Sequence, residues 1–265
     1  MILPFRKYHG TGNDFILIDN RVPGWSPATK QVAFLCDRHL GIGADGLMLL
    51  SEQPGYDFGM RYFNSDGNES SMCGNGGRCI TFFAQSLGLI RDSARFHAID
   101  GEHLAEITGT DQQTTVVRLK MTDTVIGQEY REGVFLDTGS PHLVVFVPDV
   151  EAIDVFHDGG LLREDQRFAP GGTNVDFVQK GKDHIFVRTY ERGVENETLS
   201  CGTGVTASAL ATAFRYPGNP GYCQIKTRGG ALKVSFLQHG ASFSNIWLEG
   251  EATYVFSGKV ELTGI

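Results

Sequence analysis

The octapeptide Met72-Cys73-Gly74-Asn75-Gly76-Gly77-Arg78-Cys79 has a shortened counterpart at Ser200-Cys201-Gly202-Thr203-Gly204-Val205. Each stretch places a cysteine before a glycine-punctuated loop, and an apolar run of helical character follows. The two cysteines are 201 − 73 = 128 residues apart, about half of the 265-residue chain. A thiol delivered twice by the same local device indicates a duplicated fold and a site that uses two thiols.

Composition narrows the class of protein. The formal net charge of −8 argues against nucleic acid and anionic membranes as partners. No apolar stretch reaches about 18 residues, so we expect no membrane span. The amino terminus lacks a signal-peptide layout, and five scattered cysteines form no disulfide framework. We therefore expect a cytoplasmic protein with reduced thiols.

Hydrophobic periodicity and turn residues predict a mixed α/β chain. Helices are expected from Ser26 as N-cap with Pro27 at the first position, over 75–87 with Gly88 as the C′ residue, partly over 149–162, and over 203–214. Strands are expected at 5–9, 15–19, 47–50, 58–64, 95–98, 103–107, 114–119, 133–137, 143–147, 174–178, 185–191, 225–237, 244–248, 254–256 and 259–262.

The second half of the chain repeats the order of the first. The strand at 185–191 resembles 59–64, and Arg188 and Arg61 precede their cysteines by 13 and 12 residues. The stretch 174–178 resembles 13–16. Several sequence features that recur in the same order indicate that the two halves are repeats of one unit. We predict one half-domain over 1–120, completed by a returning strand at 251–265, and a second over 121–250.

Other cysteine and glycine signals have structural explanations. Cys36 and Cys79 fall on apolar helix faces and are expected in the core. The interval from Cys73 to Cys79 does not fit a zinc site, so no metal is expected. Residues 43–46 predict a tight turn rather than a phosphate loop, because no lysine or helix start follows.

Two cysteines at helix starts favour acid–base chemistry on an amino acid. Helix starts carry unpaired N–H groups and the positive end of the dipole, which bind a carboxylate and stabilise a thiolate. With Cys73 and Cys201 on opposite faces of one α-carbon, one thiolate removes the proton and the other thiol returns one. Close approach on each side would place the sulfurs roughly 6–7 Å apart. Taken singly, each cysteine is better explained as a small residue at a helix start, and the paired occurrence reverses that preference.

The chain resembles the diaminopimelate epimerase family over essentially its full length. The motifs that carry the resemblance are 9–15, 63–67, 73–79, 141–142, 190–193, 201–204 and 250–252. The resemblance implies an α/β (α+β) fold of two pseudo-symmetric domains. In that fold, each domain is a curled mixed sheet around a central helix, and the active site lies in the cleft between the two domains. It implies epimerisation of LL-2,6-diaminopimelate to the meso form without a cofactor.

The resemblance also assigns site residues. Cys73 and Cys201 become the acid–base pair, with His142 and Glu191 tuning thiol protonation. The implied substrate-binding residues are Asn13, Asn64, Gly74, Asn75, Asn174, Glu191, Arg192, Gly202 and Thr203. Taken singly, an asparagine at a strand end is more often a turn former. Glu191 and Arg192 suit a substrate with a second amino-acid end.

The chain departs from the family pattern at two contact positions. Ser140 stands where many members carry Asn, and Gly46 where many carry Gln, so the resemblance assigns no substrate contact to either position. Residues 194–197 lengthen the loop before Cys201. A homodimer comes from the resemblance alone, since no interface pattern is visible in the sequence.

Other functions remain open from the sequence. A proline or hydroxyproline racemase or epimerase of the same fold would share both thiols, but residues 190–193 favour diaminopimelate. A non-catalytic amino-acid-binding protein or a thiol redox protein would use the same cysteines without exchanging an α-proton. A cysteine hydrolase fits less well, because it needs one cysteine with a base.

Overall fold

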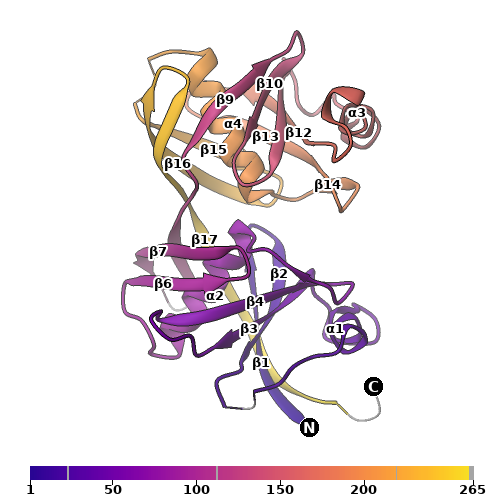
Figure 1. The fold of residues 1–265 in the computed structure, drawn as a ribbon, viewed down its shortest axis with the longest axis vertical. Helices are drawn as coiled ribbons and strands as arrows, with labels where there is room; N and C mark the ends of the chain where they lie inside the picture. The colour runs from indigo at the N-terminus through magenta and orange to yellow at the C-terminus, as the bar shows by residue number, and fades with distance from the viewer. Residues whose placement is uncertain (23, 112, 219, 263–265) are drawn as a thin grey trace. The chain divides into compact units, whose positions relative to one another are not determined.

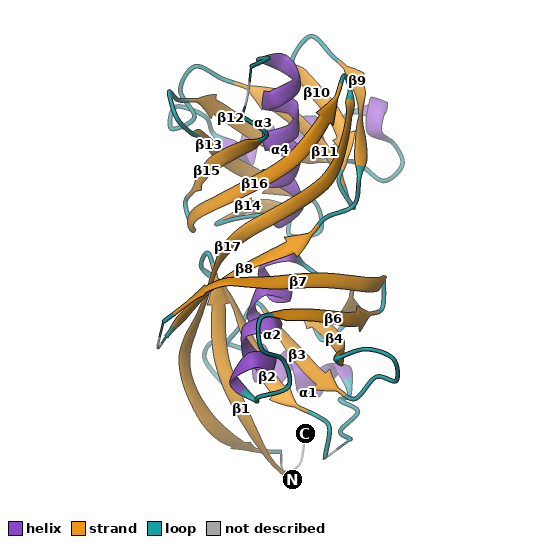
Figure 2. Cartoon of the chain, turned by 90° about the vertical axis from the view of Figure 1, so that its left-hand side faces the viewer, coloured by secondary structure: helices purple, strands orange, loops and turns teal. Residues whose placement is uncertain are grey.

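The computed structural model describes residues 1–22, 24–111, 113–218 and 220–262. The chain divides into two compact units, Met1–Leu119 with Gly250–Ile265 as unit 1, and Lys120–Glu249 as unit 2. The boundaries expected from the sequence lie one residue from these. In each unit, strands surround one long helix (Figures 1 and 2).

Unit 1 is built from strands and two helices. Its elements are β1 (Ile2–Gly10), β2 (Asn13–Asp19), α1 (Thr29–Cys36), β3 (Gly46–Ser51), β4 (Phe58–Asn64), β5 (Glu69–Ser70), α2 (Gly74–Ser86), β6 (Ser93–Ala98), β7 (Gly101–Thr110), β8 (Thr114–Lys120) and the later part of β17 (Ser242–Glu261). Strand β17 returns antiparallel to β1, with Leu3 opposite Val260.

Unit 2 repeats this plan. Its elements are β9 (Thr124–Glu129), β10 (Gly133–Asp137), β11 (Pro141–Phe146), α3 (Val155–Arg163), the 3₁₀ turn η1 (Gln166–Phe168), β12 (Asn174–Lys180), β13 (Ile185–Glu191), β14 (Asn196–Thr198), α4 (Gly202–Arg215), β15 (Tyr222–Thr227), β16 (Gly230–His239) and the first part of β17.

Strand pairing establishes the duplication. In unit 1, β2 is parallel to β3, β3 is antiparallel to β4, β4 is parallel to β6 and β6 is antiparallel to β7. In unit 2, β11, β12, β13, β15 and β16 follow the same pattern in the same order. Helix α2 precedes β6 as α4 precedes β15. The predicted fold of two repeated α/β domains is therefore confirmed.

The central helices are buried nearly all round, unlike a surface helix with one apolar stripe. Eleven residues of the 13-residue α2 are buried, and eleven of the 14-residue α4. Small residues make this close packing feasible, because added atoms would meet the surrounding strands: a Cβ on Gly77 would come within 2.9 Å of Leu119 Cδ1.

The register identifies equivalent positions in the two units. Arg61 lies opposite Leu49, and Arg188 lies opposite Phe177. Gly46 of β3 therefore corresponds to Asn174 of β12, since each also lies beside the start of the preceding parallel strand. The resemblance of 174–178 to 13–16 was consequently wrong as an equivalence, because Asn13 begins β2 and its counterpart strand is β11.

Most predicted elements are confirmed with small shifts at their ends. Helices α2 and α4 begin one residue earlier than expected, and Gly88 has a φ of +73° after α2. The expected strand 225–237 is a hairpin of β15 and β16, and the expected strands from 244 to 262 merge into β17. Cys36 and Cys79 are buried, as predicted.

The predicted N-cap at Ser26 was wrong. Helix α1 begins at Thr29, with Ala28 as its N-cap residue. The Gln31 side chain accepts a hydrogen bond from the Ala28 N–H at 3.1 Å. This bond satisfies a backbone donor at the helix start and favours Ala28 over Ser26 as the N-cap residue.

Candidate active site

Each central helix begins directly after a predicted catalytic cysteine. Cys73 is the N-cap of α2, and the Gly76 N–H donates to its Sγ at 3.2 Å. Cys201 is the N-cap of α4 and is 8% exposed, with its Sγ 3.4 Å from Thr203 Oγ1. Both thiols therefore lie where unpaired helix N–H groups concentrate positive potential.

An amide network surrounds Cys73. Its Sγ lies 3.8 Å from Asn13 Oδ1, which also accepts from Asn75 Nδ2 at 3.2 Å. Asn13 Nδ2 donates to Asp45 Oδ2 at 2.7 Å. Thr11 Oγ1 donates to Asn75 Oδ1 at 3.1 Å. The structure thus brings Asn13 and Asn75 to the Cys73 thiol with fixed amide orientations.

A buried arginine supports this network from behind. Arg78 is fully buried on α2, and its Nη2 donates to Asn75 Oδ1 at 2.8 Å. Its Nη1 donates to the Gly74 carbonyl at 3.2 Å. Sequence reasoning missed Arg78, although a charged residue on an otherwise apolar helix face is the signal that could have found it.

A different network lies beside Cys201. His142 and Asp176 are both fully buried, and His142 Nδ1 lies 2.7 Å from Asp176 Oδ2. His142 Nε2 lies 2.9 Å from Thr203 Oγ1, the hydroxyl next to Cys201 Sγ. Thr189 Oγ1 donates to Asp176 Oδ1 at 2.7 Å. His142 therefore reaches the thiol through Thr203.

Carboxylates make the surroundings of Cys201 unfavourable for a thiolate. Burial raises the pKa of the Cys201 thiol well above its usual value, and the Glu191 and Asp176 carboxylates raise it further. Burial also raises the pKa of Glu191, although Thr198 Oγ1 donates to Glu191 Oε2 at 2.9 Å. Burial and the neighbouring carboxylates favour the protonated form of Cys201.

Asn174 links three segments of unit 2. It is buried, and its Nδ2 donates to Ser140 Oγ at 2.9 Å and to the Pro141 carbonyl at 3.0 Å. Its Oδ1 accepts from the Arg192 N–H at 2.8 Å, while Arg192 Nη1 donates to the Gly171 carbonyl at 3.2 Å. Ser140 thus orients Asn174.

The structure does not bring every predicted residue to a thiol. Asn64 is exposed at the end of β4, where its N–H donates to the Asn68 carbonyl at 3.0 Å. Gly46 lies opposite it in β3, and a Cβ there would come within 2.6 Å of the Phe63 carbonyl. A longer residue at Gly46 would thus require β4 to shift.

Asp45, Asp176 and Thr189 also escaped sequence reasoning. Asp176 had a detectable signal, since a carboxylate between Val175 and Phe177 interrupts a buried apolar strand. Among the described residues, no three His, Cys, Asp or Glu side chains cluster closely enough to hold a metal ion. No helix in the described ranges is long and apolar enough to cross a membrane.

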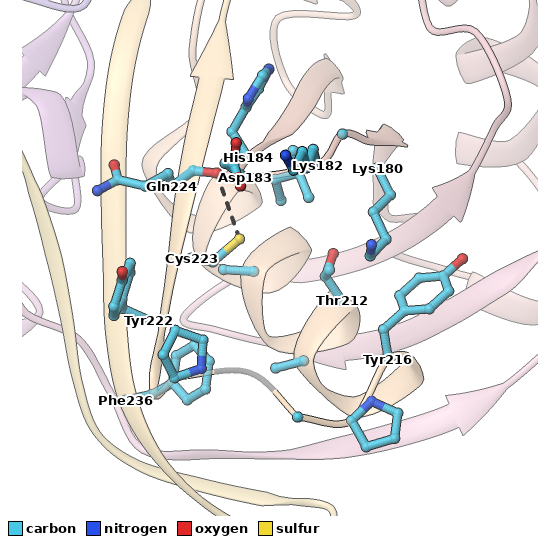
Figure 3. Close-up of a pocket in the computed structure, with 17 residues that line it drawn as sticks. Lys180, Lys182, Asp183, His184, Thr212, Tyr216, Tyr222, Cys223, Gln224 and Phe236 are labelled. Atoms are coloured by element: carbon cyan, nitrogen blue, oxygen red, sulfur yellow. Dashed lines mark hydrogen bonds between the residues drawn. The ribbon is translucent and has the colours of Figure 1, made fainter.

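A separate cavity lies at the other end of α4. It has a volume of about 440 Å³ and contains none of the predicted site residues (Figure 3). Its labelled lining includes Lys180, Thr212, Tyr216 and Cys223. A 14-residue helix is roughly 20 Å long, so this cavity lies about that far from Cys201.

Solved structures place the fold in a known class. The chain aligns with a PhzF-family phenazine biosynthesis protein from Bacillus anthracis at a TM-score of 0.77 and 15% identity, covering 99% of this chain and 100% of that one. A hydroxyproline epimerase from Agrobacterium vitis aligns at a TM-score of 0.69 and 18% identity, covering 98% and 93%. The duplicated fold is therefore the one shared by PhzF proteins and proline racemases.

Sequence comparisons identify the family within that class. The diaminopimelate epimerase family model matches residues 5–126 and 134–255. The diaminopimelate epimerases of Flavobacterium psychrophilum and Chlorobaculum tepidum are 46% and 40% identical. Each alignment covers 96% of this chain, and 98% and 99% of the respective relative. The chain belongs to the diaminopimelate epimerase family and is an isomerase.

Proposed function

We propose that the protein epimerises LL-2,6-diaminopimelate to meso-diaminopimelate by a cofactor-independent two-base mechanism. The supporting observation is the pair of cysteine N-caps, each at the start of a buried central helix in a duplicated fold. The likeness to relatives at 36–46% identity supports this substrate over proline or hydroxyproline, because the hydroxyproline epimerase is only 18% identical.

The reaction requires both sulfurs at one α-carbon. One of Cys73 and Cys201, as the thiolate, takes the α-proton of the LL substrate, and the other, as the thiol, donates its proton to the opposite face. The carbon is inverted, and the two cysteines exchange protonation states. The α-proton is weakly acidic, so the carboxylate that shares the developing charge needs stabilisation, which the N–H groups at Gly74, Asn75, Gly202 and Thr203 supply.

The remaining polar residues have complementary roles. Asn13, Asn64 and Asn174 hold the substrate's polar groups, while Glu191 and Arg192 pair with an amino group and a carboxylate. His142 and Glu191 tune the protonation of Cys201. The product would serve lysine and peptidoglycan-precursor synthesis in the cytoplasm. That the protein forms a homodimer remains a prediction.

Solvent deuterium gives a direct test. The purified protein is incubated in D2O with LL-diaminopimelate and no added cofactor, and early products are analysed. Deuterium at only the inverted α-carbon, together with meso product, supports the proposal. An amino-acid-binding or thiol redox protein would leave the α-proton in place, and absence of exchange with intact thiols would rule the proposal out.

Cysteine substitutions test the two-base assignment. Cys73→Ala and Cys201→Ala should each lower epimerisation by at least about 10³-fold, because each removes a group that transfers a proton in the transition state. Cys223→Ala is the matched control, since this half-buried thiol lies in the separate cavity. Full activity in either Cys73→Ala or Cys201→Ala would contradict the mechanism.

A further inference from the structure

Within the part of the chain that the structure describes, Arg78 is a buried cation with no carboxylate partner. Its guanidinium donates to the Gly74 carbonyl, Asn75 Oδ1, Thr11 Oγ1 at 3.4 Å and the Glu251 carbonyl at 3.4 Å, all of them neutral acceptors. Among the described residues it forms no salt bridge to a carboxylate. Burial lowers the pKa of Arg78, but arginine stays charged in proteins. An unpaired buried charge is costly, so its retention calls for a function.

The duplicated fold supplies a natural comparison. Arg78 follows Cys73 by five residues, and Thr206 follows Cys201 by five. Thr206 Oγ1 donates to the Gly202 carbonyl at 2.9 Å, as Arg78 Nη1 donates to the Gly74 carbonyl. The helix start is therefore supported by the same hydrogen bond in both units, and a neutral hydroxyl suffices for it. The positive charge is an addition confined to unit 1.

Other charged groups near α2 are largely balanced. Asp14 pairs with Lys7 at 2.8 Å and with Arg38 at 2.7 Å, and Arg38 also pairs with Asp45 at 2.7 Å. These two cations and two anions cancel. Further titratable groups on packed elements are Arg6 and Tyr8, which contact Ser86 of α2, His9 on β1, Asp100 before β7, His103 on β7, the exposed Glu251 on β17, and Cys79, whose pKa burial raises. Asp100 pairs with His103.

In unit 2 the buried charges near the catalytic cysteine are negative rather than positive. There the thiol lies beside the carboxylates of Glu191 and Asp176, and no arginine stands at the Thr206 position. Below the helix start, Gly204 packs on Asp176, whereas the equivalent Gly76 packs on Met48. A buried cation supports the Cys73 helix start, and buried anions adjoin the Cys201 helix start.

We propose that Arg78 is a positioning residue that holds Cys73 as the resting thiolate and fixes the Asn75 amide on Asn13, while Cys201 rests as the thiol. The proposal rests on the two-base function and assigns the starting protonation states. Arg78 acts through the bonds from its guanidinium to Asn75 Oδ1 and the Gly74 carbonyl. Asn75 Nδ2 is thereby directed to Asn13 Oδ1, beside the sulfur.

Site-resolved alkylation measures this without turnover. The full-length protein is treated with iodoacetamide across a pH series, and modification of each cysteine is quantified by peptide mass spectrometry. Arg78→Met should raise the pH midpoint of Cys73 alkylation by about one pH unit, a roughly tenfold loss of thiolate below the midpoint. Arg78→Lys retains the charge and should hold the midpoint within about half a pH unit of wild type.

Thr206→Val is the matched control. It removes the equivalent hydrogen bond without changing charge, so it should leave the Cys73 midpoint unchanged. An unshifted Cys73 midpoint in folded Arg78→Met would overturn the proposal, as would equal shifts in Arg78→Met and Arg78→Lys. Because alkylation needs no substrate, this failure is distinct from absent deuterium exchange in the wild type.

Discussion

The substitution Gly204→Ala should overpack the contact between α4 and the buried Asp176 beneath Cys201. A Cβ there would lie closer to Asp176 Oδ1 than real Cβ contacts allow, and 3.2 Å from His142 Cε1. Asp176 cannot move aside cheaply, because His142 and Thr189 each hold it at 2.7 Å. Overpacking costs about 1–3 kcal/mol, and loss of a hydrogen bond to a charged group costs about 1.5–3 kcal/mol. The higher helix propensity of alanine than of glycine offsets up to about 1 kcal/mol of this cost.

These terms give a net destabilisation of about 3 kcal/mol for unit 2, or a Tm lower by about 10 °C for a unit spanning residues 120–249. Differential scanning calorimetry and urea titration measure it. Gly76→Ala should cost less, about 1 kcal/mol, because its Cβ meets the flexible end of Met48.

Gly160→Ala provides the control for helix propensity. Its Cβ would meet nothing nearer than Tyr190 Oη at 3.7 Å, so the substitution should be neutral or stabilising by up to about 1 kcal/mol. Equal stabilities of Gly204→Ala and Gly160→Ala would refute the idea that Asp176 is held rigidly beneath the helix.

Three further outcomes are expected. Asp176→Asn removes a carboxylate that raises the pKa of Cys201, so alkylation of Cys201 should begin at lower pH; an unchanged or higher onset would contradict this. Arg188→Met should cost about 3 kcal/mol and Arg61→Met less than about 1 kcal/mol in urea titrations. The reason is that the Arg188 ion pair is buried, with 6% side-chain exposure against 42% for Arg61. Burial opposes ionisation of Asp14, but its two cationic partners hold its pKa well below the usual range. Its contribution to stability should therefore be present above about pH 4 and decline as pH falls, and Asp14→Asn should flatten that decline.

The sequence predicts much of this architecture because local signals and the duplication agree. The glycines after Cys73 and Cys201 permit close backbone approach, and the apolar runs behind them predict the central helices. Gly88 marks a helix end because its φ of +73° suits glycine. These features depend on residues close in the chain, which is why one sequence suffices to find them.

The contacts that differentiate the two thiols are not local. Asp176 meets His142 across a parallel strand pair, and Arg78 meets Thr11 from 67 residues away. Strand register decides those contacts, and the resemblance of 174–178 to 13–16 indicated a different register. The start of α1 at Thr29 has a different, local origin, since the Gln31 side chain accepts from the N–H of the N-cap Ala28.

The shared strand β17 also determines the order in which the chain can fold during synthesis. Unit 2 is continuous over Lys120–Glu249, so all of its strands have emerged before the last residues of unit 1 are made. Leu3 and Phe5 of β1 pack in a core that Val260 and Leu262 help to cover. Strand β1 therefore completes its pairing only after the later part of β17 has been synthesised, so unit 1 completes its sheet after the whole of unit 2 has been made.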